Sequence, residues 1–294
     1  MLSRYDLHIH TNASDGTLTP QEVVEEALRI GIDGFAITDH DTVAGLKLAS
    51  YYIKQYCLPL NFIPGIELNT EILEEEVHIL GYFINSDDAT LLDYLRNIHN
   101  ERYKRIKKMV LLLQQIGMRI SLKQVEALAH GESIGRPHVG RALIANGYVK
   151  TIKEAFAKYI GRGCVAYVPR YKFTPYEAIN LIKSAGGISV LAHPGLIKRP
   201  EIIMNIINLG IEGLEVFYPE HSADQEKELA SLAIKHSLLQ TGGSDYHGPD
   251  SQENRFSIGQ STISIKELEQ IYSYLDKKRT PRDSENVNKP SMKA

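Results

Sequence analysis

Nine side chains of the kinds that bind divalent metals stand close to the ends of short apolar runs in this chain. Six are histidines and three are carboxylates, namely His8, His10, Asp15, His40, Glu67, His78, His193, Asp245 and His247. A single histidine beside an apolar run is usually an ordinary buried residue. Core packing does not explain why the pattern recurs at so many strand ends. A barrel whose strands place functional groups at one rim explains it. The sequence therefore predicts one metal centre built from distant parts of the chain.

The donor types narrow the chemistry of this centre. Imidazole and carboxylate donors suit Zn²⁺, Mn²⁺ or Fe²⁺ rather than a thiolate-preferring ion or Ca²⁺. The two cysteines, Cys57 and Cys164, form no CxxC pair, so neither a thiolate zinc site nor a disulfide framework is expected. Nine ligands exceed the needs of one tetrahedral ion, which predicts two or three ions with a bridging carboxylate. Such ions, about 3.5 to 4 Å apart, suit phosphoester hydrolysis by a metal-bridging hydroxide.

Short strands and helices alternate along the chain and would position these residues. Strands are predicted at 5–10, 35–40, 61–67, 77–81, 187–193, 214–218 and 238–245. Helices are predicted at 20–31, 43–56, 88–116, 121–130, 137–147, 151–160, 175–185, 200–209, 222–236 and 265–277. Seven strands that alternate with helices favour an α/β fold with a parallel, barrel-like sheet, whose C-terminal rim gathers the active-site groups.

A basic segment interrupts this alternation. Residues 96–172 contain 16 lysines and arginines against four glutamates, a net charge of +12, although the whole chain carries −3. We interpret 99–174 as an inserted, mostly helical subdomain, with 1–98 and 175–277 as the barrel and 278–294 as a disordered tail. A basic segment beside a metal centre favours a polyanionic substrate. The alternative is a solvated helix face with scattered lysines.

Length and composition exclude several classes of protein. With 294 residues and 43% hydrophobic content, the chain can bury a sizeable core. It has no apolar run of about 18 residues or more and begins with a charged strand in place of a signal peptide, so we expect a cytoplasmic protein without membrane contacts. No base-reading motif accompanies the basic segment, and sequence-specific recognition of DNA is not expected.

The order and spacing of the metal-binding motifs resemble the PHP family, named for polymerase and histidinol phosphatase domains. The motifs are His8-x-His10 followed by Asp15-Gly16, Thr38-Asp39-His40, Gly65-x-Glu67, His78, Ala192-His193-Pro194 and Gly243-Ser244-Asp245-x-His247. The match spans about 1–260 and departs from the family at none of the nine positions. It implies a distorted (β/α)7 barrel with three ions, for which we expect Mn²⁺, with Zn²⁺ or Fe²⁺ as alternatives.

The same resemblance implies how the ligands are shared among the ions. One ion would take His8, His10, Glu67 and Asp245. A second would share Glu67 with His78 and His193, and a third would take Asp15, His40 and His247.

Within the family, the insertion with its Ile134-Gly135-Arg136-Pro137-His138 element resembles the branch that hydrolyses nucleoside 3′,5′-bisphosphates. Some members of that branch also act as 5′ to 3′ exoribonucleases on short RNA. The resemblance therefore implies a small nucleotide substrate that loses its 3′-phosphate, and short single-stranded RNA as a further substrate. Arg136 is the candidate for gripping a second phosphate, since guanidinium binds phosphate bidentately, with His138 beside it. The alternative for Arg136 is a surface or capping role before Pro137.

Other side chains are weaker candidates. Arg170 and Lys172 are predicted to contact phosphate, with simple solvation as the alternative, and Glu215 and His221 to line the pocket. Asp39 would orient a ligand histidine or cap the following helix.

Catalytic roles are predicted for three residues. Arg136 would neutralise charge on the phosphoryl oxygens, with His138 beside it. His247 could protonate the leaving oxygen, but a metal-bound histidine is a poor donor, so the general acid stays unassigned.

Two other functions remain open. The runner-up is a histidinol-phosphate phosphatase, against which the basic insertion argues, because a small monophosphate needs no extended basic surface. From another class, the chain could be an inactive metal- or RNA-binding module, although nine intact ligands argue for catalysis.

Overall fold

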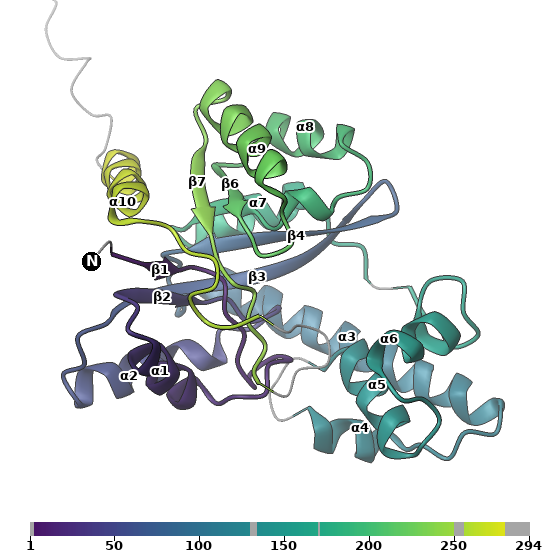
Figure 1. Ribbon diagram of the computed structural model, residues 1–294. Coiled ribbons are helices and arrows are strands. Elements are labelled where there is room, and N and C mark those ends of the chain that lie inside the picture. The colour runs from purple at the N-terminus through teal and green to yellow at the C-terminus, as the bar shows by residue number, and fades with distance from the viewer. Residues whose placement is uncertain (1–2, 130–133, 170, 250–255, 280–294) are drawn as a thin grey trace, which may run out of the picture.

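Seven strands form one sheet in chain order in the computed structural model, which describes residues 3–129, 134–169, 171–249 and 256–279 (Figure 1). The strands are β1 (Tyr5–Asp6), β2 (Gly34–Ile37), β3 (Asn61–Ile72), β4 (Glu75–Tyr82), β5 (Ile188–Leu191), β6 (Gly213–Phe217) and β7 (Leu239–Gly242). The chain after β1 meets the chain around the end of β7, where Leu7 N donates to Gly242 O at 3.1 Å and Asp245 N donates to His8 O at 2.7 Å. The predicted distorted (β/α)7 barrel is confirmed.

The predicted parallel direction is wrong for one strand. β4 runs antiparallel to both β3 and β5, whereas the other paired strands are parallel. β3 and β4 form a hairpin joined by Leu73 and Glu74, both with left-handed φ of 50° and 67°. A two-residue hairpin turn takes this backbone geometry, and it leaves no room for a crossover helix. His78 consequently lies within a strand and not beyond its carboxyl end.

Helices pack against the outer face of the sheet, and capping residues in the sequence mark where several of them begin. They are α1 (Pro20–Ile30), α2 (Ala44–Gln55), α7 (Pro175–Ser184), α8 (Glu201–Asn208) and α9 (Ala223–Lys235). A short turn η2 (Pro194–Leu196) follows β5, and α10 (Ile265–Arg279) packs on the other face of the strands. Thr19, Thr174 and Ser222 each form a capping box with the side chain three residues later, which satisfies amides that the first helical turn leaves unpaired. Within the described residues, no helix is long and apolar enough to cross a membrane.

Two hydrophobic clusters lie on opposite faces of the strands. Ile79 and Leu191 belong to the large cluster beneath the outer helices. Their strand neighbours Leu80 and Val190 belong to a second cluster, which α10 covers with Leu268 and other residues. The alternation arises because successive side chains along a strand point to opposite faces of the sheet. The end of the barrel away from α10 is left for polar side chains.

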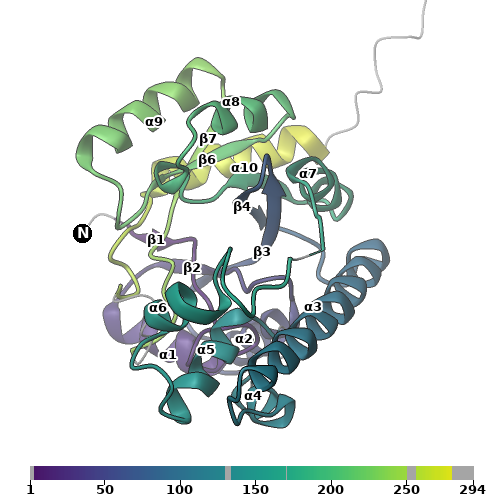
Figure 2. The same cartoon turned by 90° about the vertical axis from the view of Figure 1, so that its right-hand side faces the viewer.

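The segment between β4 and α7 projects from one side of the barrel (Figures 1 and 2). It contains α3 (Ala89–Gln115), α4 (Leu122–Leu128), α5 (Arg136–Ala145), α6 (Ile152–Ala155) and η1 (Phe156–Ile160). Ile98 of α3 packs in the barrel cluster, whereas Ile106 packs in a separate cluster of the insertion. The predicted boundary near residue 99 falls between them, although the domain division itself remains a prediction.

The predicted disordered tail lies largely outside the described residues. Of 278–294, the structure describes only Lys278 and Arg279, which belong to α10. Lys278 Nζ donates to Gly187 O at 2.7 Å and to Glu212 Oε1 at 2.6 Å. The assignment of Lys278 to the tail is therefore wrong, because these contacts hold it on the barrel.

Candidate metal centre

All nine predicted ligands gather at one end of the barrel. Three groups place their donor atoms within 4.8 Å of one another: His8, His10, Glu67 and Asp245; His10, Asp15, His40 and His247; and His40, Glu67 and His78. His193 joins them through Nε2, which lies 3.3 Å from Glu67 Oε1. The first group has the membership implied for one ion. The others differ by including His10 and His40, so the number of ions and the sharing of ligands remain predictions.

Glu67 occupies the middle of this cluster. Its side chain is 1% exposed, and its two oxygens face different sets of rings. Oε2 lies 3.4, 3.2 and 3.0 Å from His8 Nε2, His10 Nε2 and His40 Nδ1, and Oε1 lies 2.8 and 3.3 Å from His78 Nδ1 and His193 Nε2. A carboxylate placed in this way is suited to bridging two ions.

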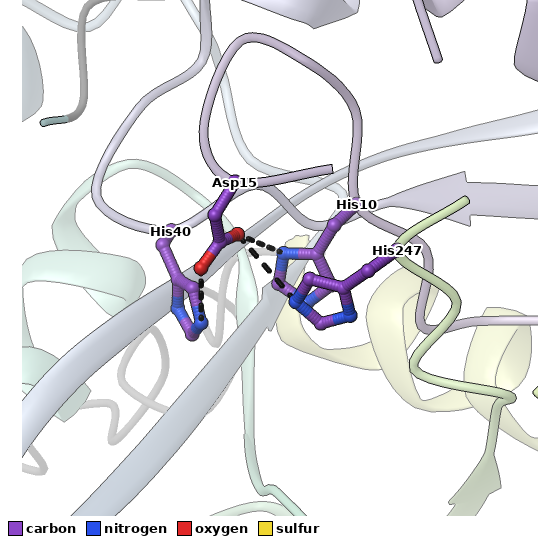
Figure 3. A group of neighbouring side chains, drawn as sticks. All are labelled: His10, Asp15, His40 and His247. Carbon is purple, nitrogen blue, oxygen red and sulfur yellow. Dashed lines mark ion pairs between the residues drawn. The ribbon is translucent and has the colours of Figure 1, made fainter. Parts of the chain in front are cut away.

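Asp15 organises a second set of donors (Figure 3). Asp15 Oδ1 lies 3.7 Å from His10 Nδ1 and 3.5 Å from His247 Nε2, and Oδ2 lies 3.8 Å from His40 Nε2. These separations exceed ordinary hydrogen bonds. They match donors on either side of an ion, because metal–nitrogen and metal–oxygen bonds of about 2.0 to 2.2 Å keep neighbouring ligands roughly 3 to 4 Å apart.

Several donor atoms are buried without a hydrogen-bond partner among the described residues. They are His8 Nε2, both ring nitrogens of His10, Asp15 Oδ1 and Glu67 Oε2. An unpaired buried polar atom costs roughly 1 to 3 kcal/mol, so five together in one cluster require an explanation. Divalent ions would satisfy all five, and the residues therefore fit a metal centre.

The electrostatics of the cluster point the same way. Burial lowers the pKa of His10, but the nearby carboxylates of Asp245 and Glu67 outweigh it and raise the pKa to about 10. Burial raises the pKa of Asp15, yet His40 and His247 hold it well below its usual range. The carboxylates thus favour a cationic ring at His10, whereas burial lowers the pKa of His40 to about 4. Protons and metal ions compete for the same nitrogens, so metal binding would release protons.

Glu215 holds two of the proposed ligands in place. It is fully buried on β6, where Oε1 lies 2.9 Å from His8 Nδ1 and Oε2 accepts the backbone N–H of His193 at 2.7 Å. His193 has left-handed φ and ψ of 30° and 55°, an arrangement that costs about 1 to 3 kcal/mol and persists only when neighbours impose it. The contact with His8 Nδ1 leaves Nε2 to face the metal centre. Sequence reasoning had placed Glu215 only at the pocket wall.

We expect Glu215→Gln to weaken Mn²⁺ binding about 10- to 100-fold, as loss of a carboxylate behind a ligand histidine does in other metal sites. Glutamine keeps the shape but cannot supply the negative charge that His8 meets. Titration calorimetry with Mn²⁺ measures the change, and Glu228→Gln on the exposed face of α9 is the matched control. Equal affinities for the two variants would remove Glu215 from the support of the centre.

Gly243 gives the backbone of His8 the space it needs. A Cβ at Gly243 would lie 2.3 Å from His8 N and 2.4 Å from His8 Cβ. Either the chain just after β7 or His8 would have to move, so we expect Gly243→Ala to lower the free energy of unfolding by about 1 to 3 kcal/mol and to reduce Mn²⁺ binding. Denaturant unfolding and bound-metal analysis test this. A variant with unchanged stability and metal content would show that the close approach is unimportant.

Two histidines with predicted substrate contacts bond to main-chain groups. His138 is 1% exposed, and its Nδ1 accepts the N–H of Gly135 at 3.0 Å, which caps α5. His221 is 8% exposed, with Nδ1–H donating to Val216 O at 2.8 Å and Nε2 accepting from Gly195 N at 3.0 Å. Both rings bond to main-chain groups, which does not support the predicted substrate contacts; these contacts stay predictions.

His247 also has both ring nitrogens engaged. Nδ1–H donates to Asp245 O at 2.8 Å, and Nε2 faces Asp15. His247 is therefore placed to act as a metal ligand, and its part in proton transfer stays a prediction.

Asp39 has neither of its two predicted roles. Its carboxylate accepts Thr11 N at 2.7 Å, Thr11 Oγ1 at 2.7 Å and Ser14 Oγ at 2.6 Å. These bonds hold the loop that leads into Asp15. Asp39 consequently supports the centre through backbone and hydroxyl groups, and not through a histidine ring.

A cavity of about 580 Å³ lies between the metal centre and the insertion. Arg136 lines it: Nη2 donates to Glu76 Oε2 at 3.0 Å, and the guanidinium carbon lies 4.9 Å from the Phe156 ring centre. Glu76 Oε1 in turn lies 3.1 Å from His78 Nε2, so one carboxylate separates Arg136 from a proposed metal ligand.

Other cations of the cavity were missed by sequence reasoning. Arg102, Arg105 and Lys153 line it, but no motif distinguishes them among the basic residues of the insertion. Lys172 is exposed and is not among the lining residues. Its predicted phosphate contact is not supported, and Arg170 lies outside the described residues.

Known proteins share this arrangement of sequence and fold. Residues 6–165 match the family model described as the PHP domain. The chain is 34% identical over 252 residues to the 5′-3′ exoribonuclease Rnm of Escherichia coli, covering 83% of this chain and 85% of that relative. It is 32% identical over 256 residues to the 3′,5′-nucleoside bisphosphate phosphatase of Chromobacterium violaceum, covering 84% and 88%.

A solved structure from Bifidobacterium adolescentis, described as a "putative metal-dependent phosphoesterase", superposes with a TM-score of 0.82 at 32% identity. The superposition covers 92% of this chain and 95% of that one. Together with the family match and the two relatives, it shows that this chain belongs to the PHP family and is a metal-dependent phosphoester hydrolase.

Proposed function

We propose that this enzyme removes the 3′-phosphate from nucleoside 3′,5′-bisphosphates. The observation that carries the proposal is a cavity with proposed metal ligands on one wall and arginine and lysine side chains on the other, among them Arg105, Arg136 and Lys153. We call the lining formed by the proposed metal ligands the metal wall. A monophosphate ester needs only this wall, whereas a bisphosphate also uses the arginine and lysine side chains of the other wall. The name of the Chromobacterium violaceum relative supports this assignment.

Each wall would perform a separate part of the reaction. Two or three divalent ions, expected to be Mn²⁺, would supply an activated water and neutralise charge on the phosphoryl oxygens. Glu67 and Asp15 hold the histidine donors around them. Arg136 would bind the remote phosphate bidentately, and the Phe156 ring beside it keeps the guanidinium in its orientation. The remote phosphate replaces Glu76 as the anionic partner of Arg136.

We also propose that the enzyme trims short single-stranded RNA from its 5′ end. The Escherichia coli relative, with 34% identity, is named for this activity. In this chain, Tyr171 lines the cavity and its side chain is 58% exposed, so its ring is available for stacking on a base.

Three substrates under one metal test the proposal. Adenosine 3′,5′-bisphosphate, a 5′-phosphorylated short RNA and histidinol phosphate are compared for kcat/KM with Mn²⁺. We expect the bisphosphate to be turned over best, with adenosine 5′-monophosphate and phosphate as products. Best turnover of histidinol phosphate would overturn the bisphosphate assignment, and an intact RNA substrate would remove the second activity.

A further inference from the structure

Three arginines of the insertion bond to the part of the barrel that carries the proposed metal ligands. Arg136 bonds to the carboxylate of Glu76, and Arg102 bonds to the carboxylate of Asp41. Arg141 donates to the backbone carbonyl of Asp15 at 2.7 Å. Arg136 is the proposed substrate contact. Arg102 differs because its partner is almost completely buried and lies next to a metal ligand.

Asp41 is fixed on several sides. Its side chain is 3% exposed, and Asn69 donates to Oδ1 through its backbone N and to Oδ2 through Nδ2, both at 3.0 Å. Asp41 N donates to Glu67 O at 2.9 Å, and the backbone has a left-handed φ of 53°. Asn69 Nδ2 also lies 3.1 Å from His40 Nδ1. The carboxylate is therefore held by β3, the strand that supplies Glu67, and it directly follows His40 in the chain. Its charge is compensated by Arg102.

Arg102 connects this carboxylate to the start of α5. Its Nη1 donates to Asp41 Oδ2 and its Nε donates to Ile134 O at 3.0 Å. Ile134 and Gly135 directly precede Arg136, and a Cβ at Gly135 would lie only 3.0 Å from Arg102 Nη2. Because the guanidinium is a rigid planar fork, the position of Asp41 determines where the chain enters α5.

We propose that Asp41 and Arg102 form a positioning pair that holds the first turn of α5, and with it Arg136, at a fixed place opposite the metal centre. The proposal rests on the proposed function in one respect, namely that Arg136 binds the remote phosphate. An exposed ion pair would contribute little to such a task. Here Arg102 is 21% exposed and Asp41 3%, so the loss of either partner leaves the other charge partly buried without its counter-charge.

The test compares Arg102→Ala with Arg96→Ala, a matched control on α3 whose side chain is 72% exposed and pairs with Asp93. Each Mn²⁺-loaded variant is assayed for kcat and KM on adenosine 3′,5′-bisphosphate and on phenyl phosphate. Hydrogen–deuterium exchange is followed across residues 136–145. We expect Arg102→Ala to raise the KM for the bisphosphate about tenfold, comparable to the loss of one charged hydrogen bond, and to leave phenyl phosphate turnover within about twofold.

The exchange measurement and a double variant distinguish the loss of Arg136 positioning from a general loss of fold stability. Arg102→Ala should speed exchange in the first turn of α5 while β5 stays protected. Arg102→Lys keeps the charge but cannot bond Asp41 and Ile134 in the same geometry, so it should give an intermediate KM. Arg102→Ala combined with Arg136→Ala should lose no more than Arg136→Ala alone, because both act on one contact.

Equal losses on both substrates, additive losses in the double variant or unchanged exchange in α5 would each overturn the positioning pair. The proposed function fails separately. If no variant or parent enzyme hydrolyses the bisphosphate while exchange in α5 still rises, the substrate assignment falls and the positioning pair stands.

Discussion

Glu67→Gln is expected to lower kcat/KM for phosphate esters by about 1000-fold, or roughly 4 kcal/mol of transition-state stabilisation. Glutamine has nearly the same shape, so the change isolates the negative charge. That charge faces five histidine rings through two oxygens: His8, His10 and His40 on one side, and His78 and His193 on the other. Without it, no buried carboxylate remains to bridge two ions at this position, and the Mn²⁺ content should fall in parallel.

Bound metal and steady-state kinetics on phenyl phosphate measure the effect of Glu67→Gln. The matched control is Glu71→Gln on the same strand, because Glu71 pairs with Arg162 of the insertion and lies outside the cluster of donors. The control should keep its metal and its activity. A Glu67→Gln enzyme with full metal content and activity within about tenfold of the parent would contradict the central role of this carboxylate.

Arg136→Ala should lower kcat/KM for adenosine 3′,5′-bisphosphate by about 10- to 100-fold, the range expected for a charged hydrogen bond. Phenyl phosphate has no remote phosphate, so its turnover should change by less than about threefold. Arg136→Lys should fall between, since lysine keeps the charge but loses the bidentate fork.

The two substrates provide the internal control for Arg136. Equal losses on both would mean that the variant disturbs the metal wall, which Arg136 touches through Glu76 and His78. In that case Arg136 would have no part in selecting a bisphosphate.

The metal centre was predictable because its signal is local. Histidine and carboxylate side chains bind metals by virtue of their residue type alone. A barrel strand that ends beside such a residue brings it to the rim, whichever strands lie next to it. The direction of β4 was not predictable in the same way. The turn at Leu73 and Glu74 contains no glycine or asparagine to mark a hairpin, and an apolar strand has the same pattern in either direction.

Residues whose role depends on a distant backbone group were the least predictable. His221 has the residue type of a catalytic group, yet its ring meets the amide of Gly195, which only the fold brings close. The ring of His138 meets the amide of Gly135, three residues earlier, and this bond depends on where α5 begins. Arg102 presents the opposite case, because nothing in the sequence distinguishes it from the other cations of the insertion until Asp41 lies beside it. Charge counting could find the basic segment but not the arginines that define its geometry.

The ratio of kcat/KM for adenosine 3′,5′-bisphosphate to that for adenosine 3′-monophosphate with Mn²⁺ measures most directly whether the insertion selects a second phosphate. The two molecules present the same scissile phosphate and differ only in the remote 5′-phosphate. If the metal wall performs the hydrolysis and the insertion binds the second phosphate, the bisphosphate should be favoured by about 100-fold. A ratio near one would mean that the arginine and lysine side chains of the cavity contribute nothing to substrate choice, and the bisphosphate assignment would fall.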